Sequence, residues 1–76
     1  MKKGKLTAYT IYDHPSDFPN SFVVRRFVVR GPDPEPDALP YAVGPTLAAV
    51  RRRLPPGLYR LRRSAADEPQ IVETWI

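Results

Sequence analysis

The sequence predicts a small α+β domain of the order β-β-α-β-β, in which a four-stranded, mainly antiparallel sheet carries one short helix packed on one face. Two observations support this fold class. Residues 44–57 have the periodicity and the end signals of a helix, and segments rich in β-branched and aromatic residues lie on both sides of them. Because a chain of 76 residues supports one modest core, residues 1–76 are expected to form a single domain.

The first pair of strands is expected at residues 6–12, LTAYTIY, and residues 22–29, FVVRRFVV, joined by a loop with two prolines. Each alternating face of FVVRRFVV carries one arginine among apolar residues, so the pattern does not say which face is buried. A sheet covered by a helix on one side only would leave its other side partly apolar and exposed. That arrangement is a hint of a partner surface or a dimer.

A Pro-rich acidic crossover is expected at residues 31–40, GPDPEPDALP. Proline at every second position blocks both helix and ladder and favours an extended polyproline II chain. The simpler interpretation is a solvated connection between the second strand and the helix. The functional alternative is an acidic flap, formed by Asp33, Glu35 and Asp37, that lies over arginines.

The helix is expected within GPTLAAVRRRLPPG. Leu47, Val50 and Leu54 fall at i, i+3 and i+7 and therefore share one face. Thr46 or the proline before it can start the helix, and the double proline that follows Leu54 should end it there. A helix this short is marginal alone in water, so its three apolar side chains must pack on a sheet.

The second pair of strands is expected at residues 57–63, GLYRLRR, and residues 70–76, QIVETWI. A register that places Arg60 opposite Glu73 sorts the pair into one apolar face and one charged face. Arg60 and Glu73 on opposite faces of the sheet would exclude this register.

Composition excludes several classes of site. The chain has no cysteine, which removes disulfides and thiolate metal sites, and no apolar run follows its basic start. We therefore expect a cytoplasmic protein with no membrane segment, no metal and no cofactor. Twelve Lys and Arg against eight Asp and Glu give a net charge of +4, which permits binding to a polyanion without requiring it.

Four strings, YTIYDHP, FVVRR, LPPGLYRL and DEPQIVETWI, resemble a group of small bacterial and prophage-encoded proteins of unknown function, and together they cover most of the chain. The resemblance implies a self-contained small protein of bacterial or prophage origin. It supplies no activity and no site residues to carry over.

A catalytic site is not expected. The one histidine, His14, follows Tyr12 and Asp13, and such a cluster can in principle transfer protons. In a loop before proline, however, an aspartate usually hydrogen-bonds the turn backbone. One histidine without cysteine also makes a zinc site improbable.

Two binding functions remain, and the leading one is a non-enzymatic protein-interaction module. Its candidate partner surface consists of Phe22, Val24, Phe27 and Trp75. The alternative is nucleic-acid binding, with arginines that contact phosphates and tyrosines or Trp75 that stack on bases if they share a face. The candidate contacts are Arg25, Arg26, Arg51, Arg52, Arg53, Arg60, Arg62 and Arg63. Arginines on both a helix and a sheet need not converge, so a solvated surface is the simpler interpretation of the same residues.

Overall fold

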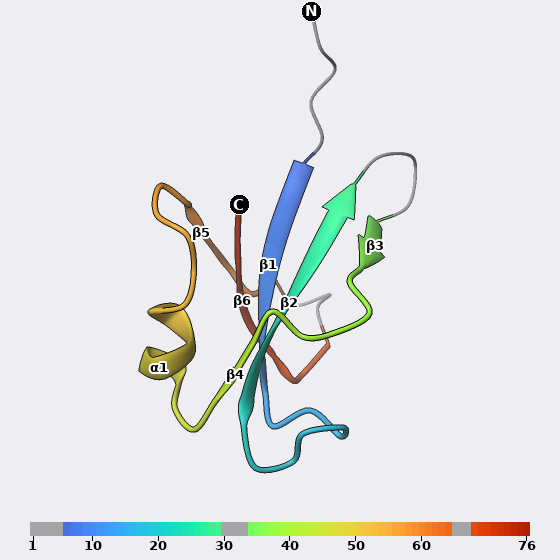
Figure 1. Cartoon of the computed structure of the whole chain (residues 1–76), viewed down its shortest axis with the longest axis vertical. Coiled ribbons are helices and arrows are strands. Elements are labelled where there is room, and N and C mark those ends of the chain that lie inside the picture. The colour runs from blue at the N-terminus through green and yellow to red at the C-terminus, as the bar shows by residue number, and fades with distance from the viewer. Residues whose placement is uncertain (1–5, 30–33, 65–67) are drawn as a thin grey trace, which may run out of the picture.

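A computed structural model describes residues 6–29, 34–64 and 68–76 (Figure 1). Within these ranges, six strands form one antiparallel sheet and a single helix packs against it. In chain order the elements are β1 (Leu6–Asp13), β2 (Phe22–Val29), β3 (Pro34–Pro36), β4 (Ala42–Gly44), α1 (Leu47–Arg51), β5 (Arg60–Arg62) and β6 (Ile71–Trp75).

The strand order is β3-β2-β1-β6-β5. On the side of β2 away from β1, β4 pairs with the first three residues of β2 and β3 pairs with its last three. The α+β class and the antiparallel sheet with one short helix are therefore as predicted. Four strands is wrong, because the segment between β2 and α1 adds two short strands. The two predicted hairpins join through β1 and β6, which lie side by side at the centre (Figure 1).

The polyproline prediction fails for residues 34–36, which pair with β2 as an edge strand. The backbone N–H of Asp37 donates to the carbonyl of Arg26 at 2.9 Å. Hydrogen-bonding positions alternate along a strand, so the nitrogens of Pro34 and Pro36 point away from β2. Proline at every second position is therefore compatible with an edge strand.

The helix begins as predicted and ends early. The side chain of Thr46 accepts a hydrogen bond from the N–H of Ala49 at 3.1 Å, which makes it the N-cap. The α-helix ends at Arg51 and not at Leu54, although Arg52 keeps right-handed helical backbone angles. Leu54 precedes a proline and so disfavours the α conformation, and its N–H bonds to the carbonyl of Arg51 at 3.2 Å, three residues back, in a tighter turn.

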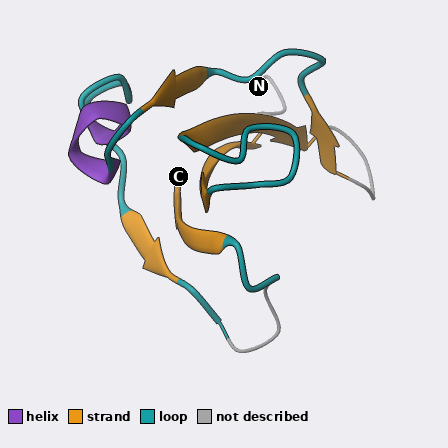
Figure 2. Ribbon diagram, turned by 90° about the horizontal axis from the view of Figure 1, so that it is seen from below, coloured by secondary structure: helices purple, strands orange, loops and turns teal. Residues whose placement is uncertain are grey.

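The core lies between the sheet and α1. Its cluster of buried residues is Tyr9, Ile11, Val24, Ala42 and Val50. Leu47 and Leu54 pack against this cluster beside Val50, so the predicted apolar face of the helix is confirmed. Figure 2, a view from below, shows α1 to one side of the strands. A Cβ at Gly44 would lie 3.1 Å from a Val50 methyl group, so glycine at this position permits the close approach of helix and sheet.

The β5–β6 register differs from the prediction by two residues: Arg60 pairs with Trp75, Leu61 with Thr74 and Arg62 with Glu73. A shift of two residues leaves Arg60, Leu61 and Arg62 on their predicted faces, so Arg60 and Glu73 still share one face. That charged face is the one that α1 covers.

Candidate functional site

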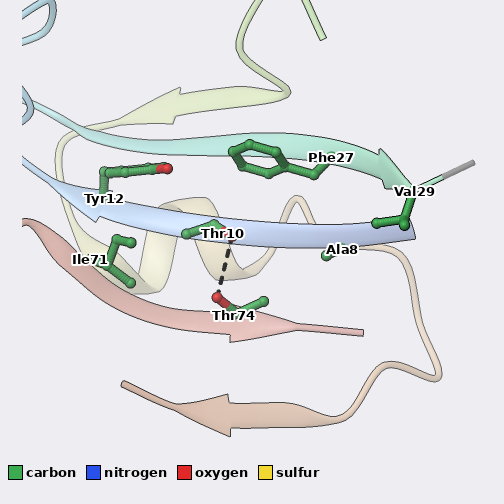
Figure 3. Close-up of a pocket in the computed structure, with 7 residues that line it drawn as sticks. All are labelled: Ala8, Thr10, Tyr12, Phe27, Val29, Ile71 and Thr74. Atoms are coloured by element: carbon green, nitrogen blue, oxygen red, sulfur yellow. Dashed lines mark hydrogen bonds between the residues drawn. The ribbon is translucent and has the colours of Figure 1, made fainter. Parts of the chain in front are cut away.

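The face of the sheet opposite α1 is called the open face here. One end of it is covered, because Val23 belongs to this face and is fully buried, and Asp17 of the β1–β2 loop bonds to Arg25 on it. Figure 3 shows its central side chains projecting from three adjacent strands, with α1 behind the sheet. They line a shallow depression of about 340 Å³. The lining residues are Ala8, Thr10, Tyr12, Phe27, Val29, Ile71 and Thr74.

The floor of the depression is polar but satisfied. The hydroxyls of Thr10 and Thr74 bond to each other at 3.2 Å, and Thr10 is buried. Irregular pairing of β6 with β1 places Ile71 opposite Tyr12 in this face, whereas Val72 packs against the core. The walls are therefore aromatic and aliphatic, without a charged group.

Exposed apolar side chains extend the open face beyond the depression. Leu6 is 53% exposed and alternates along β1 with Ala8. Leu61 is 45% exposed and lies opposite Thr74, and Val43 lies opposite Val23.

The ladder between β5 and β6 continues one residue further and adds two more apolar side chains to this face. Tyr59 and Ile76 exchange two backbone hydrogen bonds of 2.7 and 2.9 Å. Tyr59 therefore alternates with Leu61, and Ile76 with Thr74, on the open face. The sixth large exposed hydrophobic side chain of the described residues, Leu39, lies in the loop between β3 and β4.

One charged side chain belongs to the open face of the described strands. Arg25 lies opposite Thr10 and bonds to the carboxylate of Asp17 in the β1–β2 loop. The described strands therefore give this face no net charge.

The predicted partner surface is divided by the sheet. Of its four residues, Phe27 alone is on the open face. Val24 is fully buried in the core, and Phe22 and Trp75 pack against the core on the helix side. The two alternating faces of FVVRRFVV are similar in composition, so the sequence does not indicate which of them lies in the core. Tyr12, Leu6 and Leu61 were missed, although the alternation in LTAYTIY groups Leu6 with Tyr12.

The helix side of the sheet holds an ion pair that anchors α1. Arg51 donates to both carboxylate oxygens of Glu73, from Nε at 2.8 Å and from a terminal nitrogen at 2.7 Å. The indole N–H of Trp75 donates to the same carboxylate at 2.8 Å, and Arg60 lies 3.9 Å away. Only 5% of the Glu73 side chain is exposed. The anion that Arg51 binds is therefore part of the domain itself.

The other predicted anion contacts are divided between the two sides of the sheet. Arg25 lies on the open face, whereas Arg26 lies on the helix side and donates to Asp37 at 2.7 Å. Asp37 thus meets an arginine as the acidic-flap hypothesis expects, but Asp33 and the side chain of Glu35 lie outside the described residues. Arg60 and Arg62 share the helix side with Glu73. The exposed arginines are Arg52, Arg53, Arg60, Arg62 and Arg63.

We expect the free energy of unfolding to fall in acid partly because of Glu73. Hydrogen bonds from Arg51 are the main cause that lowers its pKa in the folded domain, against the opposing effect of burial. The contribution is therefore complete above the ordinary pKa of 4.5 and is lost as pH falls through the lower folded value. NMR titration of the Glu73 carboxyl carbon should show a midpoint below that of a glutamate in a short peptide. In the Glu73→Gln variant, the free energy of unfolding should fall less steeply as the pH is lowered. A midpoint above the peptide's would contradict this ion pair.

The Tyr12-Asp13-His14 cluster does not converge on a pocket. Tyr12 lines the open face, and Asp13 points to the other side of the strand. Asp13 and His14 bond to each other at the surface, and the His14 ring meets the Phe22 ring edge-on at 5.3 Å. His14 has a φ of 52°, and its N–H bonds to Ser21 across the loop at 2.9 Å, so the cluster closes the hairpin.

The described ranges contain neither a metal-binding cluster of side chains nor a membrane-spanning helix. No three His, Cys, Asp or Glu residues come together there in a group that could hold a metal ion. No helix in the same part of the chain is long and apolar enough to cross a membrane. The expectations about metals and localisation stay predictions.

Comparisons with protein-family models, with curated proteins and with solved structures return no match. The resemblance to prophage-encoded proteins therefore stays a prediction. The surfaces described above are the basis for any function assigned to the chain.

Proposed function

We propose that this chain is a small, non-enzymatic protein-interaction domain and that the open face is its binding surface. The observation that carries the proposal is the distribution of exposed apolar side chains. Of the six large exposed hydrophobic residues in the described ranges, Leu6, Val43, Tyr59, Leu61 and Ile76 belong to one face of the sheet. Contiguous apolar surface of this kind marks interaction sites in soluble proteins.

The chemistry of the open face suits an apolar protein partner. Its polar side chains at the centre, Thr10 and Thr74, already bond to each other, and Arg25 is paired with Asp17. A partner therefore needs an apolar surface that is complementary in shape to the open face. Its binding would bury no unpaired charge of the open face.

Nucleic-acid binding has less support. Arg25, Arg26 and Arg51 already bind carboxylates of this chain. Arg25 also lies on the opposite side of the sheet from the other two. A phosphate backbone would meet these arginines only at the expense of existing ion pairs.

A selection from a random peptide library displayed on phage tests the proposal. The bait is the wild-type domain, and the comparison is the double variant Leu6→Lys, Leu61→Lys, which places two charges on the open face. We expect selected peptides to bind the double variant at least about tenfold more weakly, because a lysine there must be desolvated on binding.

Leu39→Lys is the matched control, because it makes the same change at a leucine that is 77% exposed and outside the open face. Peptides should bind this control as they bind the wild type. A selection that gives only peptides with equal affinity for the wild type and the double variant would overturn the proposal.

A further inference from the structure

Building on the proposed function, we infer that the partner of the open face is a second copy of this chain, packed face to face across a two-fold axis. The two sheets would then form a sandwich between two outer helices. The argument has three parts: the area of the face, its charge, and the state of the sheet edges.

The area of the open face is near the lower limit for a specific dimer. The six strands contain 30 residues, and each residue covers about 3.3 Å along a strand and about 4.8 Å across it, which gives a face of roughly 480 Å². A standard stable interface buries about 800 Å² on each partner, and weaker specific ones bury less. The open face is therefore large enough for a weak specific dimer, while packing quality and not area determines the dissociation constant.

The charge of the open face favours its own copy. In a two-fold interface the same patch meets itself, so any net charge on it would be repelled. The described strands give the open face none, because its arginine, Arg25, is bound by Asp17. A strongly charged partner would find no electrostatic attraction on this surface, whereas a second copy of the same apolar face would meet no electrostatic repulsion.

The shape of the open face also suits packing against itself. The depression lies on β1, β2 and β6, and the exposed Leu61 stands beside it on β5. Sheets that stack face to face lie about 10 Å apart with interdigitating side chains. Such packing would bring Leu61 of one copy into the depression of the other copy.

The sheet edges offer less for self-association. At one end of the sheet the edge strands are β3 and β4, which have three residues each, and two of the three residues of β3 are prolines. At the other end of the sheet, β5 has only three residues, two of which are arginines. Short and charged edge strands are poor templates for pairing with another chain.

Sedimentation equilibrium on the full chain, from about 5 µM to about 1 mM, tests the inference. We expect the wild type to dimerise with a micromolar dissociation constant. Leu61→Lys should raise that constant at least about tenfold, whereas Leu39→Lys should change it less than about twofold. Leu6→Lys, at a side chain that is 53% exposed, provides a second variant, and circular dichroism on each variant checks that it is folded.

Isotope-filtered NOE spectra of a mixed labelled and unlabelled sample should locate the contact. Intermolecular NOEs are expected between the methyl groups of Leu61 and the side chains that line the depression. A monomer throughout the concentration range would overturn the inference, as would a dimer that Leu61→Lys and Leu6→Lys leave intact. If the chain is monomeric while selected peptides still discriminate the double variant, self-association alone fails and the proposed function stands.

Discussion

Replacing Ile11 by alanine should destabilise the domain by about 4 kcal/mol. Ile11 is fully buried at the centre of β1, within the cluster that includes Val24 and Val50. The substitution removes three methyl or methylene groups and leaves a cavity that paired strands on both sides cannot close. A small domain is stable by only about 5 kcal/mol, so the variant should keep only about 1 kcal/mol of stability, and urea unfolding followed by circular dichroism should show a midpoint close to zero denaturant.

Ile11→Val is the matched control for this prediction. It removes one methylene group at the same position and should destabilise the domain by only about 1 kcal/mol. Equal losses for the two variants, or a fully stable Ile11→Ala domain, would mean that Ile11 does not occupy the centre of the core.

Arg51→Ala should reduce the free energy of unfolding by about 2 kcal/mol, because it removes the partner of a buried carboxylate from a pair whose arginine side chain is 37% exposed. Glu73 would keep the indole N–H of Trp75 but lose both hydrogen bonds from Arg51. A carboxylate with 5% of its side chain exposed has little access to water in compensation. Thermal and urea unfolding of the variant would measure the loss.

Arg52→Ala and Arg53→Ala are natural controls, because these neighbouring arginines are exposed. Each should change the free energy of unfolding by less than about 0.5 kcal/mol. Equal effects at all three arginines would show that general charge, and not the contact with Glu73, determines the result.

Short-range sequence patterns predicted the helix and strands well where the neighbouring residues in the sequence determine the backbone conformation. The bounds of β2 match the run FVVRRFVV, and Thr46 caps the helix as its position before the apolar face indicated. The early end of α1 is also local in origin, because it follows from the proline after Leu54.

Long-range contacts account for what the sequence did not predict. Alternation fixes which face a residue takes but not the register along the strand, so Arg60 was placed two residues away from its true partner, Trp75. The strand at residues 34–36 depends on a free edge of β2, which no local pattern reveals.

The same limit applies to the candidate site. Both faces of β2 looked alike in sequence, and the choice between them follows from where α1 and the core lie. Arg51 was a candidate phosphate contact, with a solvated surface as the simpler interpretation, but it binds Glu73, 22 residues further along the chain. The burial of Glu73 is a tertiary event and has no counterpart in QIVETWI itself.

The central pairing of β1 with β6 has a kinetic consequence. Thr10 and Thr74, which bond across these strands, are 64 residues apart in sequence. During synthesis on the ribosome, the edge of β1 that pairs with β6 stays unpaired until β6 has emerged. Topologies dominated by such distant contacts fold in roughly milliseconds to seconds, so we expect refolding from urea to be slow for a domain of this size.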